Sequence, residues 1–467
     1  MTDRKTTLAR LGGRTAAGVA GLAATAAVLA AVAGVPFSTA QAKPASRVVT
    51  PVPATATAAC PGALLTLSSD ASSSAVSATG TPSVVSGGSA TPGSAALGTP
   101  DLTGGGNAPT GLQLPARDGG EPLLAAAQSL AVSTPELRGL AVASCGQPDY
   151  DQWLVGGATS LGQTTFVLLS NPGDVAATVN LAVYFEQGEA AGAGGQGIVV
   201  RPHTQRTIAL SGLAPNASAT VVHVSSTGGT VSAELQQSAI SGVTPQGVDW
   251  VGPAAAPAKN LVIPGVTVAA PAAGASDADD DALPALRVMP VGSQDAKLTI
   301  GVRPETGSRG GEATTVTVSH GVVSEVPLDK VGKGTYTVTI ASSTPVVAAV
   351  RSTTTDAKKG TDFAWYAAAR PLRGGSAVAV ASGTGARLHL VNTSSAAVSV
   401  KLAGPGGGTV QVPAGASISR AASPGVLTTA DAHGLVMSVS YSGAGQLGSY
   451  LAYPTGASAS ALTVYKR

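Results

Sequence analysis

Short runs of alternating apolar and polar residues recur along most of the chain, and turn-forming residues end each run. The clearest run is Ala177 to Phe185, where Val179, Leu181, Val183 and Phe185 fall on one side of an extended backbone. A period of two is typical of a strand with one buried face. Such runs follow about every ten residues, and Gly or Pro interrupts them before a helical period develops. The pattern therefore predicts an all-β protein built from antiparallel sandwiches.

The same order of signals occurs three times. A strand that holds Phe166, Leu298 or Leu388 opens each unit, a turn and paired strands follow, and an aromatic strand closes it. The closing aromatic residues are Trp250, Trp365 and Tyr450. A repeated aromatic position indicates core packing, and a sugar-stacking platform is the alternative. The repeats predict tandem immunoglobulin-like β-sandwich domains at residues 60–268, 286–373 and 374–467, with an acidic linker at 269–285.

Two segments of the first domain have a different pattern. Residues 68–120 are rich in Ser, Gly, Thr and Pro and have no strong period, which predicts a long surface insertion loop. Leu123 to Leu137 predicts a short helix that ends near Ser133, because Pro135 pushes the preceding residue out of the helical region.

The N-terminus has the pattern of an export signal. Four basic residues precede an uncharged Ala/Val/Leu/Gly run from Thr15 to Val35, and Ala40-Gln41-Ala42 then offers small residues for cleavage. The run is also long enough to cross a bilayer. Residues 1–42 are therefore a cleaved signal peptide or a retained membrane anchor, and residues 43–59 form a tether. Either reading predicts an extracytoplasmic protein, secreted or anchored to the cell membrane by its N-terminal segment.

Composition removes several classes of function. A net charge of +2 gives no reason to expect a nucleic-acid partner. No phosphate-binding loop, zinc motif or nucleophile elbow occurs in the sequence, and Asp277 to Asp281 lack the spacing of a calcium-binding loop. We therefore expect no catalytic, cofactor-binding or metal-binding residues, and no enzyme.

The two cysteines, Cys60 and Cys145, are predicted to form a disulfide, as an even count in an exported chain usually does. The bridge would close a loop of about 85 residues and stabilise the fold by about 4 kcal/mol. The alternative, a catalytic thiol, needs a histidine base, and the five histidines are scattered without a catalytic context.

Asp149, Asp151 and Trp153 form a polar and aromatic cluster just before the first repeat. Such a group is a candidate ligand surface. The plainer interpretation is a loop that enters a strand.

Several short motifs resemble an actinobacterial secreted-protein family, domain of unknown function 5719. They are Cys60-Pro-Gly, Cys145 followed by Asp151-Gln-Trp153-Leu-Val-Gly-Gly157, Asn171-Pro-Gly-Asp174, Val221-Val-His223-Val and Val262-Ile-Pro264-Gly265. The resemblance implies an exported, membrane-associated protein with no assigned activity. Family members look to be encoded near envelope glycosyltransferases, which implies a role in the cell envelope.

We expect a non-enzymatic envelope protein that acts as a scaffold or binding module. Two alternatives remain: an enzyme of cell-wall glycans with the Asp149–Trp153 cluster at its site, or an accessory subunit of an envelope glycosyltransferase. The expected partners are accordingly an envelope glycan or a membrane glycosyltransferase.

Overall fold

The computed structural model describes residues 46–49, 54–67, 76–103, 107–117, 120–269, 283–306, 311–328, 330–453 and 462–465. The predicted signal or anchor and the acidic run at 270–282 lie outside these residues. Within them the prediction of an all-β fold is confirmed: antiparallel strands dominate, and the only helical turns are η1 (Ala193–Gly195) and η2 (Leu210–Gly212). In this part of the chain no helix is both long and apolar enough to span a membrane.

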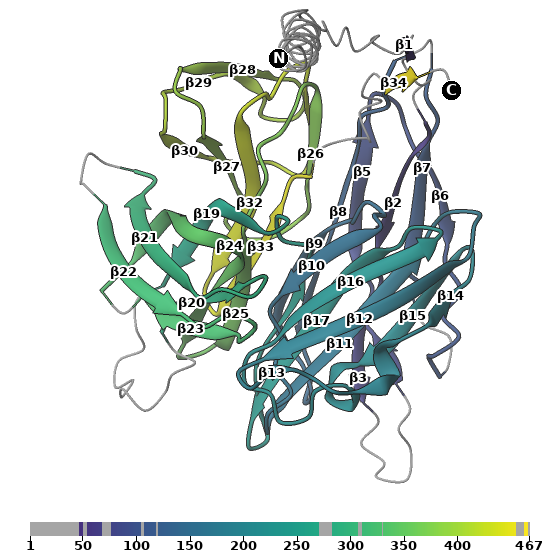
Figure 1. Cartoon of the computed structure of the whole chain (residues 1–467), viewed down its shortest axis with the longest axis vertical. Coiled ribbons are helices and arrows are strands. Elements are labelled where there is room, and N and C mark those ends of the chain that lie inside the picture. Colours follow the sequence, from purple (N-terminus) through teal and green to yellow (C-terminus); the bar gives the residue numbers. More distant parts are fainter. Residues whose placement is uncertain are drawn as a thin grey trace, which may run out of the picture. The chain divides into compact units, whose positions relative to one another are not determined.

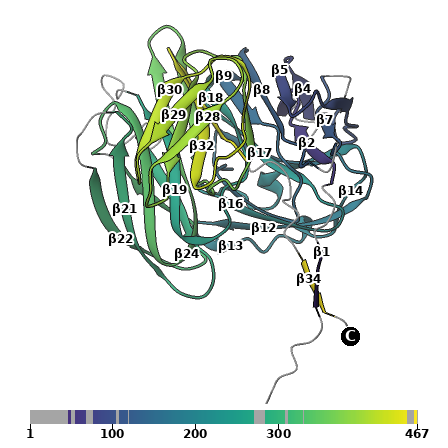
Figure 2. The same cartoon turned by 90° about the horizontal axis from the view of Figure 1, so that it is seen from above.

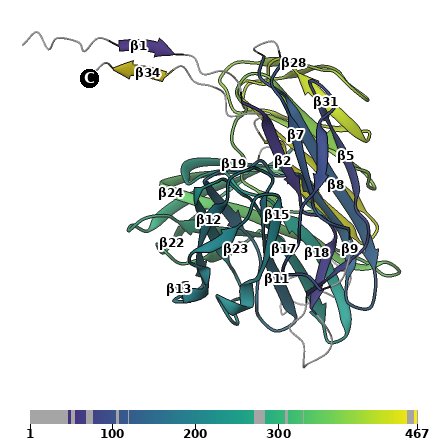
Figure 3. The same cartoon turned by 90° about the vertical axis from the view of Figure 1, so that its right-hand side faces the viewer.

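The chain divides into two units. The smaller unit comprises residues 1–51 and 459–467, and in it β1 (Ser46–Val49) pairs antiparallel with β34 (Leu462–Tyr465). Figure 3 shows this pair as a purple and a yellow arrow. The larger unit, residues 52–458, holds all the other strands of the described residues.

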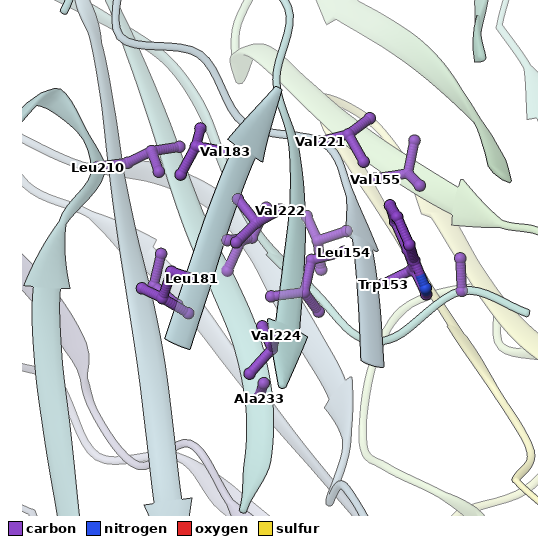
Figure 4. Packing of buried hydrophobic residues seen from close by; sticks show 14 of the residues in the cluster. Trp153, Leu154, Val155, Leu181, Val183, Leu210, Val221, Val222, Val224 and Ala233 are labelled. Atoms are coloured by element: carbon purple, nitrogen blue, oxygen red, sulfur yellow. The ribbon is translucent and has the colours of Figure 1, made fainter. Parts of the chain in front are cut away.

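The first repeat is two sheets around one core. Its strands are β10 (Asp151–Val155), β11 (Gln163–Asn171), β12 (Ala177–Phe185), β13 (Gly188–Glu189), β14 (Ile198–Val200), β15 (Thr204–Ala209), β16 (Val221–Gly228), β17 (Ser232–Ser241) and β18 (Thr244–Val251). One sheet has the order β15-β11-β17-β18; the other has the order β10-β16-β12-β13, with β14 also on β12. Apolar side chains such as Leu154, Leu181 and Val224 fill the core (Figure 4).

The N-terminal segment also forms strands, which corrects two predictions. They are β2 (Ala56–Cys60), β3 (Leu64–Leu67), β4 (Val76–Thr79), β5 (Ser83–Gly88), β6 (Gly93–Ala96), β7 (Thr110–Leu114), β8 (Leu124–Ser133) and β9 (Arg138–Ser144). The expected loop at residues 68–120 thus holds four of them, and the expected helix is β8. Since β8 lies between β5 and β9 with Ala126, Ala127 and Leu130 all buried, sheet pairing and burial outweigh the intrinsic helix preference of its alanines.

The second and third repeats supply the rest of the unit (Figures 1 and 2). The second repeat and the strand that leads into it comprise β19 (Ala258–Val268), β20 (Ala285–Pro290), β21 (Ala296–Pro304), β22 (Glu312–Val318), β23 (Ser324–Pro327), β24 (Gly334–Asp356) and β25 (Gly360–Ala367). The third comprises β26 (Ser376–Val380), β27 (Arg387–Asn392), β28 (Val398–Leu402), β29 (Gly408–Val412), β30 (Ser417–Ala421), β31 (Gly425–Thr429), β32 (Leu435–Gly443) and β33 (Gln446–Leu451). The long strand β24 pairs with four others. The third repeat has a four-stranded sheet β30-β27-β32-β33 and two two-stranded sheets, β26-β31 and β28-β29.

Four strands, which we call the central strands, bring the repeats together. They are β9, β18, β25 and β33, and each pairs with only one strand of its own sheet. Their free edges face one another around a common axis, much as propeller blades meet. A buried free edge leaves backbone N–H groups without sheet partners, so side chains must supply the acceptors.

Asp362 is one such acceptor. Its Oδ2 accepts hydrogen bonds from the N–H groups of Leu140 (2.9 Å) and Leu447 (3.0 Å), and its Oδ1 accepts one from Val248 (3.3 Å). One carboxyl group on β25 therefore binds the other three central strands. A Cβ at Gly139 would lie 2.1 Å from Oδ1, which explains why glycine stands beside it.

The three closing aromatic residues are buried, as predicted: Trp250, Trp365 and Tyr450 are 1%, 2% and 8% exposed. Trp365 belongs to the second repeat in sequence but packs in the core of the first. Leu447, from the third repeat, packs in the core of the second. The repeats therefore share their cores inside one compact unit, and the predicted boundaries of independent domains stay a prediction.

Candidate ligand-binding site

A cavity of about 420 Å³ lies at the carboxyl ends of the central strands. We call it the axial cavity. It is lined by Gln147, Pro148, Asp149, Tyr150, Gln152, Thr230, Pro253, Ala254, Ala255, Arg370, Leu451, Ala452 and Tyr453. Residues at or beyond the ends of β9, β18, β25 and β33 all contribute, so the cavity exists only when the four strands are assembled. Asp362 binds N–H groups nearer the amino ends of these strands, which places it away from the cavity mouth.

The segment with Asp149 is held rigidly by its neighbours. The Asp149 N–H donates to the carbonyl oxygen of Val231 (3.0 Å). The buried Gln152 side chain donates from Nε2 to the same carbonyl (2.6 Å) and accepts the N–H of Ala233 at Oε1 (3.2 Å). Asp149 Oδ1 accepts the N–H of Tyr150 (2.7 Å). The backbone that carries Asp149 is thus held at the cavity wall, and the carboxylate is oriented there by its bond to the adjacent N–H.

The three residues of the predicted ligand surface do not form one site. Asp149 lines the axial cavity, but Asp151 and Trp153 do not. Asp151 Oδ2 lies 2.9 Å from Nε2 of His223, and the Trp153 ring stacks on the same imidazole with 4.1 Å between centroids. Because successive side chains of a strand point to opposite faces, Asp151 and Trp153 share a face of β10 that Gln152 does not.

Sequence reasoning missed the basic side of the cavity. Arg370 follows β25, is exposed, and makes no hydrogen bond or ion pair with the described residues. The Ala369 N–H donates a hydrogen bond to the carbonyl oxygen of Val262 (2.8 Å), and the Leu372 N–H donates one to the carbonyl oxygen of Leu435 (2.7 Å). These bonds fix the backbone on both sides of Arg370. Nothing in the local pattern around Arg370 signals that it meets Asp149 in one cavity.

Tyr453 also lines the axial cavity, and its hydroxyl donates to the carbonyl oxygen of Pro253 (3.0 Å). Burial raises the pKa of Tyr453, the charge of Glu234 raises it further, and Arg370 lowers it. Glu234 itself is 3% exposed, and neither of its oxygens has a hydrogen-bond partner among the described residues. Burial raises the pKa of Glu234 to about 8, against a smaller opposing effect of the Gly146 N–H. Glu234 is therefore largely protonated at neutral pH.

A serine, a histidine and a carboxylate form a second polar cluster. Nδ1 of His389 lies 2.5 Å from Oε2 of Glu305, and Nε2 lies 2.7 Å from Oγ of Ser440. This series resembles the one that activates serine nucleophiles. However, His389 is 0% exposed and none of the three lines the axial cavity, so a substrate has no access to the serine. The cluster joins the second repeat to the third.

Two further predictions concern covalent and metal sites. The disulfide between Cys60 and Cys145 is confirmed and links β2 to the residue after β9. Within the described ranges, no group of three or more His, Cys, Asp or Glu side chains could hold a metal ion. The acidic run from Asp277 to Asp281 lies outside those ranges.

Comparison with known proteins identifies the family. A model for a family of unknown function, DUF5719, matches residues 102–423. The chain belongs to this family. The match includes Asp149, Arg370 and Asp362, whereas Cys60 and Tyr453 lie beyond its ends. No curated protein and no solved structure matches the chain.

Proposed function

We propose that this DUF5719 protein is an exported, non-enzymatic component of the cell envelope that binds a glycan in the axial cavity. The observation that carries the proposal is the cavity itself, which segments at the ends of all four central strands enclose. A concave site of about 420 Å³ with a few fixed polar groups has the size and character of a small-ligand site. Export rests on the basic N-terminus and the apolar run that follows it.

The carboxylates of the cavity favour binding over hydrolysis of a glycan. Glycosidases use two carboxyl groups that face each other across the bond that breaks. Among the described residues that line the axial cavity, Asp149 is the one carboxylate. Glu234 is buried and does not line it. We therefore infer that Asp149 accepts hydrogen bonds from ligand hydroxyls.

The test uses the full chain and fragmented envelope polysaccharide, with binding followed by microscale thermophoresis. We expect wild type to bind and Asp149→Asn to bind at least tenfold more weakly, since the ligand loses a charged acceptor. Asp174→Asn is the matched control, because Asp174 is exposed, pairs with His203 and does not line the cavity.

Two results would contradict this function. If the wild-type protein does not bind the envelope polysaccharide, the axial cavity is not a glycan site. Release of new reducing ends by wild type, lost in Asp149→Asn, would instead support a glycan-active enzyme. Co-purification with a membrane glycosyltransferase would add the role of accessory subunit without moving the ligand site.

A further inference from the structure

The charged groups of the axial cavity indicate which glycan it takes. Arg370 and Asp149 are the only charged side chains among its described lining residues, and they form no salt bridge with each other. Each is therefore available to a ligand. The remaining lining consists mainly of Pro, Ala, Leu and Tyr, so few other polar side chains compete for the charged groups of a ligand.

Arg370 is suited to an anionic group. A guanidinium presents a planar array of N–H donors that matches a carboxylate or phosphate in a bidentate arrangement. The fixed backbone at Ala369 and Leu372 limits the ordering that binding requires. Asp149 in the same cavity repels a doubly charged phosphate more strongly than a singly charged carboxylate. Arg370 and Asp149 together therefore favour a ligand with a single negative charge.

The other groups fit a sugar ring. Asp149 accepts hydrogen bonds only, so its partner must be a hydroxyl or amine donor. Tyr150 is 54% exposed at the cavity, and an aromatic face packs well against the C–H groups of a pyranose. We propose that the axial cavity binds a saccharide with one carboxylate, a uronic acid, whose carboxylate lies on Arg370 and whose hydroxyls bind Asp149. This assignment rests on the proposed function and names its ligand class.

The experiment compares three small probes by isothermal titration calorimetry on the full chain: a glucuronic acid disaccharide, the methyl ester of the same disaccharide, and alanylalanine. We expect the acid to bind at least tenfold more tightly than its ester in wild type. Arg370→Ala should remove that preference while weak binding of the ester persists, and Arg370→Lys should restore part of it. Arg373→Ala is the matched control, because Arg373 is exposed nearby but does not line the cavity.

The outcomes separate the two proposals. If the acid and the ester bind equally tightly, and Arg370→Ala changes neither affinity, the assignment of a uronic acid is overturned. The axial cavity would still be a glycan site. If alanylalanine binds as tightly as the acid, the assignment of the ligand as a saccharide is also overturned. If no disaccharide binds and the envelope polysaccharide does not bind either, the proposed function fails together with this inference.

Discussion

The indole Nε1–H of Trp365, on β25 of the second repeat, donates a 2.8 Å hydrogen bond to Oε1 of Gln237 on β17 of the first. The guanidinium of Arg287 lies over the same indole, 4.4 Å from the ring centroid. One aromatic side chain thus fills the core of a neighbouring repeat and satisfies a buried amide there.

Substitution of this tryptophan should destabilise the whole unit. Trp365→Ala removes a ring that is 2% exposed, and we expect the free energy of unfolding to fall by about 3–5 kcal/mol. Trp365→Phe should cost less, because the ring is partly retained and Gln237 Oε1 still accepts the N–H of Gly157. Urea denaturation followed by circular dichroism measures both values. Equal stability of Trp365→Ala and wild type would contradict the burial of this ring in the core.

Asp362 should be among the most sensitive residues in the fold. Asp362→Ala leaves the N–H groups of Leu140, Val248 and Leu447 without their acceptor, and we expect a loss of about 3–5 kcal/mol. Asp356→Ala is the control, because Asp356 also accepts two N–H groups but does so in an exposed turn. Its substitution should have a clearly smaller effect, since water can replace the lost acceptor there. Similar losses of stability in the two variants would contradict a larger contribution from the buried hydrogen bonds that Asp362 accepts from the central strands.

Stability should fall as the pH rises from about 4.5 to about 8. Burial holds the pKa of Glu234 near 8 in the folded protein, above its ordinary value of 4.5, so the folded state carries a proton that the unfolded state has lost. Stability from this group is present below pH 4.5 and decreases by about 5 kcal/mol across the window. Burial also raises the pKa of Asp249 and Asp362, which acts in the same direction.

The pH dependence can be assigned by substitution. Glu234→Gln keeps the shape of the side chain and cannot ionise, so its stability should vary less between pH 5 and pH 8 than that of wild type. Glu136→Gln, at an exposed turn, is the control. If the free energy of unfolding of Glu234→Gln changes between pH 5 and pH 8 as much as that of wild type, the Glu234 carboxyl group is solvated in the folded protein.

Reduction of the disulfide should weaken the fold. Cys60 and Cys145 are separated by 85 residues, and opening a loop of that length should cost about 4–5 kcal/mol in the chain-entropy model. Urea unfolding with and without a phosphine reductant measures the difference. A Cys60→Ala, Cys145→Ala double variant should be insensitive to the reductant, and a response by that variant would point to another cause.

Local pattern predicted the strands well where one face is buried. The alternating run Ala177–Phe185 is strand β12 with the same bounds. The repeat is also visible in side-chain detail. Asn171 follows the opening strand residues of the first repeat and Asn392 those of the third, and each donates from Nδ2 to carbonyl groups of its own repeat and accepts a turn N–H at Oδ1. The prediction was wrong at β8. Both faces of this strand are buried along most of its length, so its burial does not alternate from residue to residue.

The candidate site was predictable only in part. Asp149 lies in a short polar segment that composition makes conspicuous, whereas Arg370 and Tyr453 come from other repeats. Their meeting depends on the assembly of four central strands, which is a property of contacts between residues far apart in sequence. The Ser440–His389–Glu305 cluster was missed for the same reason, since its members come from three separate elements with no common motif.

The circle of central strands closes between β9 and β33, which are the first and the last of the four to leave the ribosome. Through most of synthesis Asp362 therefore lacks the Leu447 N–H, and the cavity lacks Leu451, Ala452 and Tyr453. Contacts of such large sequence separation form late and slowly, because chain closure must come before their stabilisation. A nascent chain consequently has no axial cavity until its final repeat arrives, so a chain exported in the unfolded state, as we propose, would complete this cavity only after export.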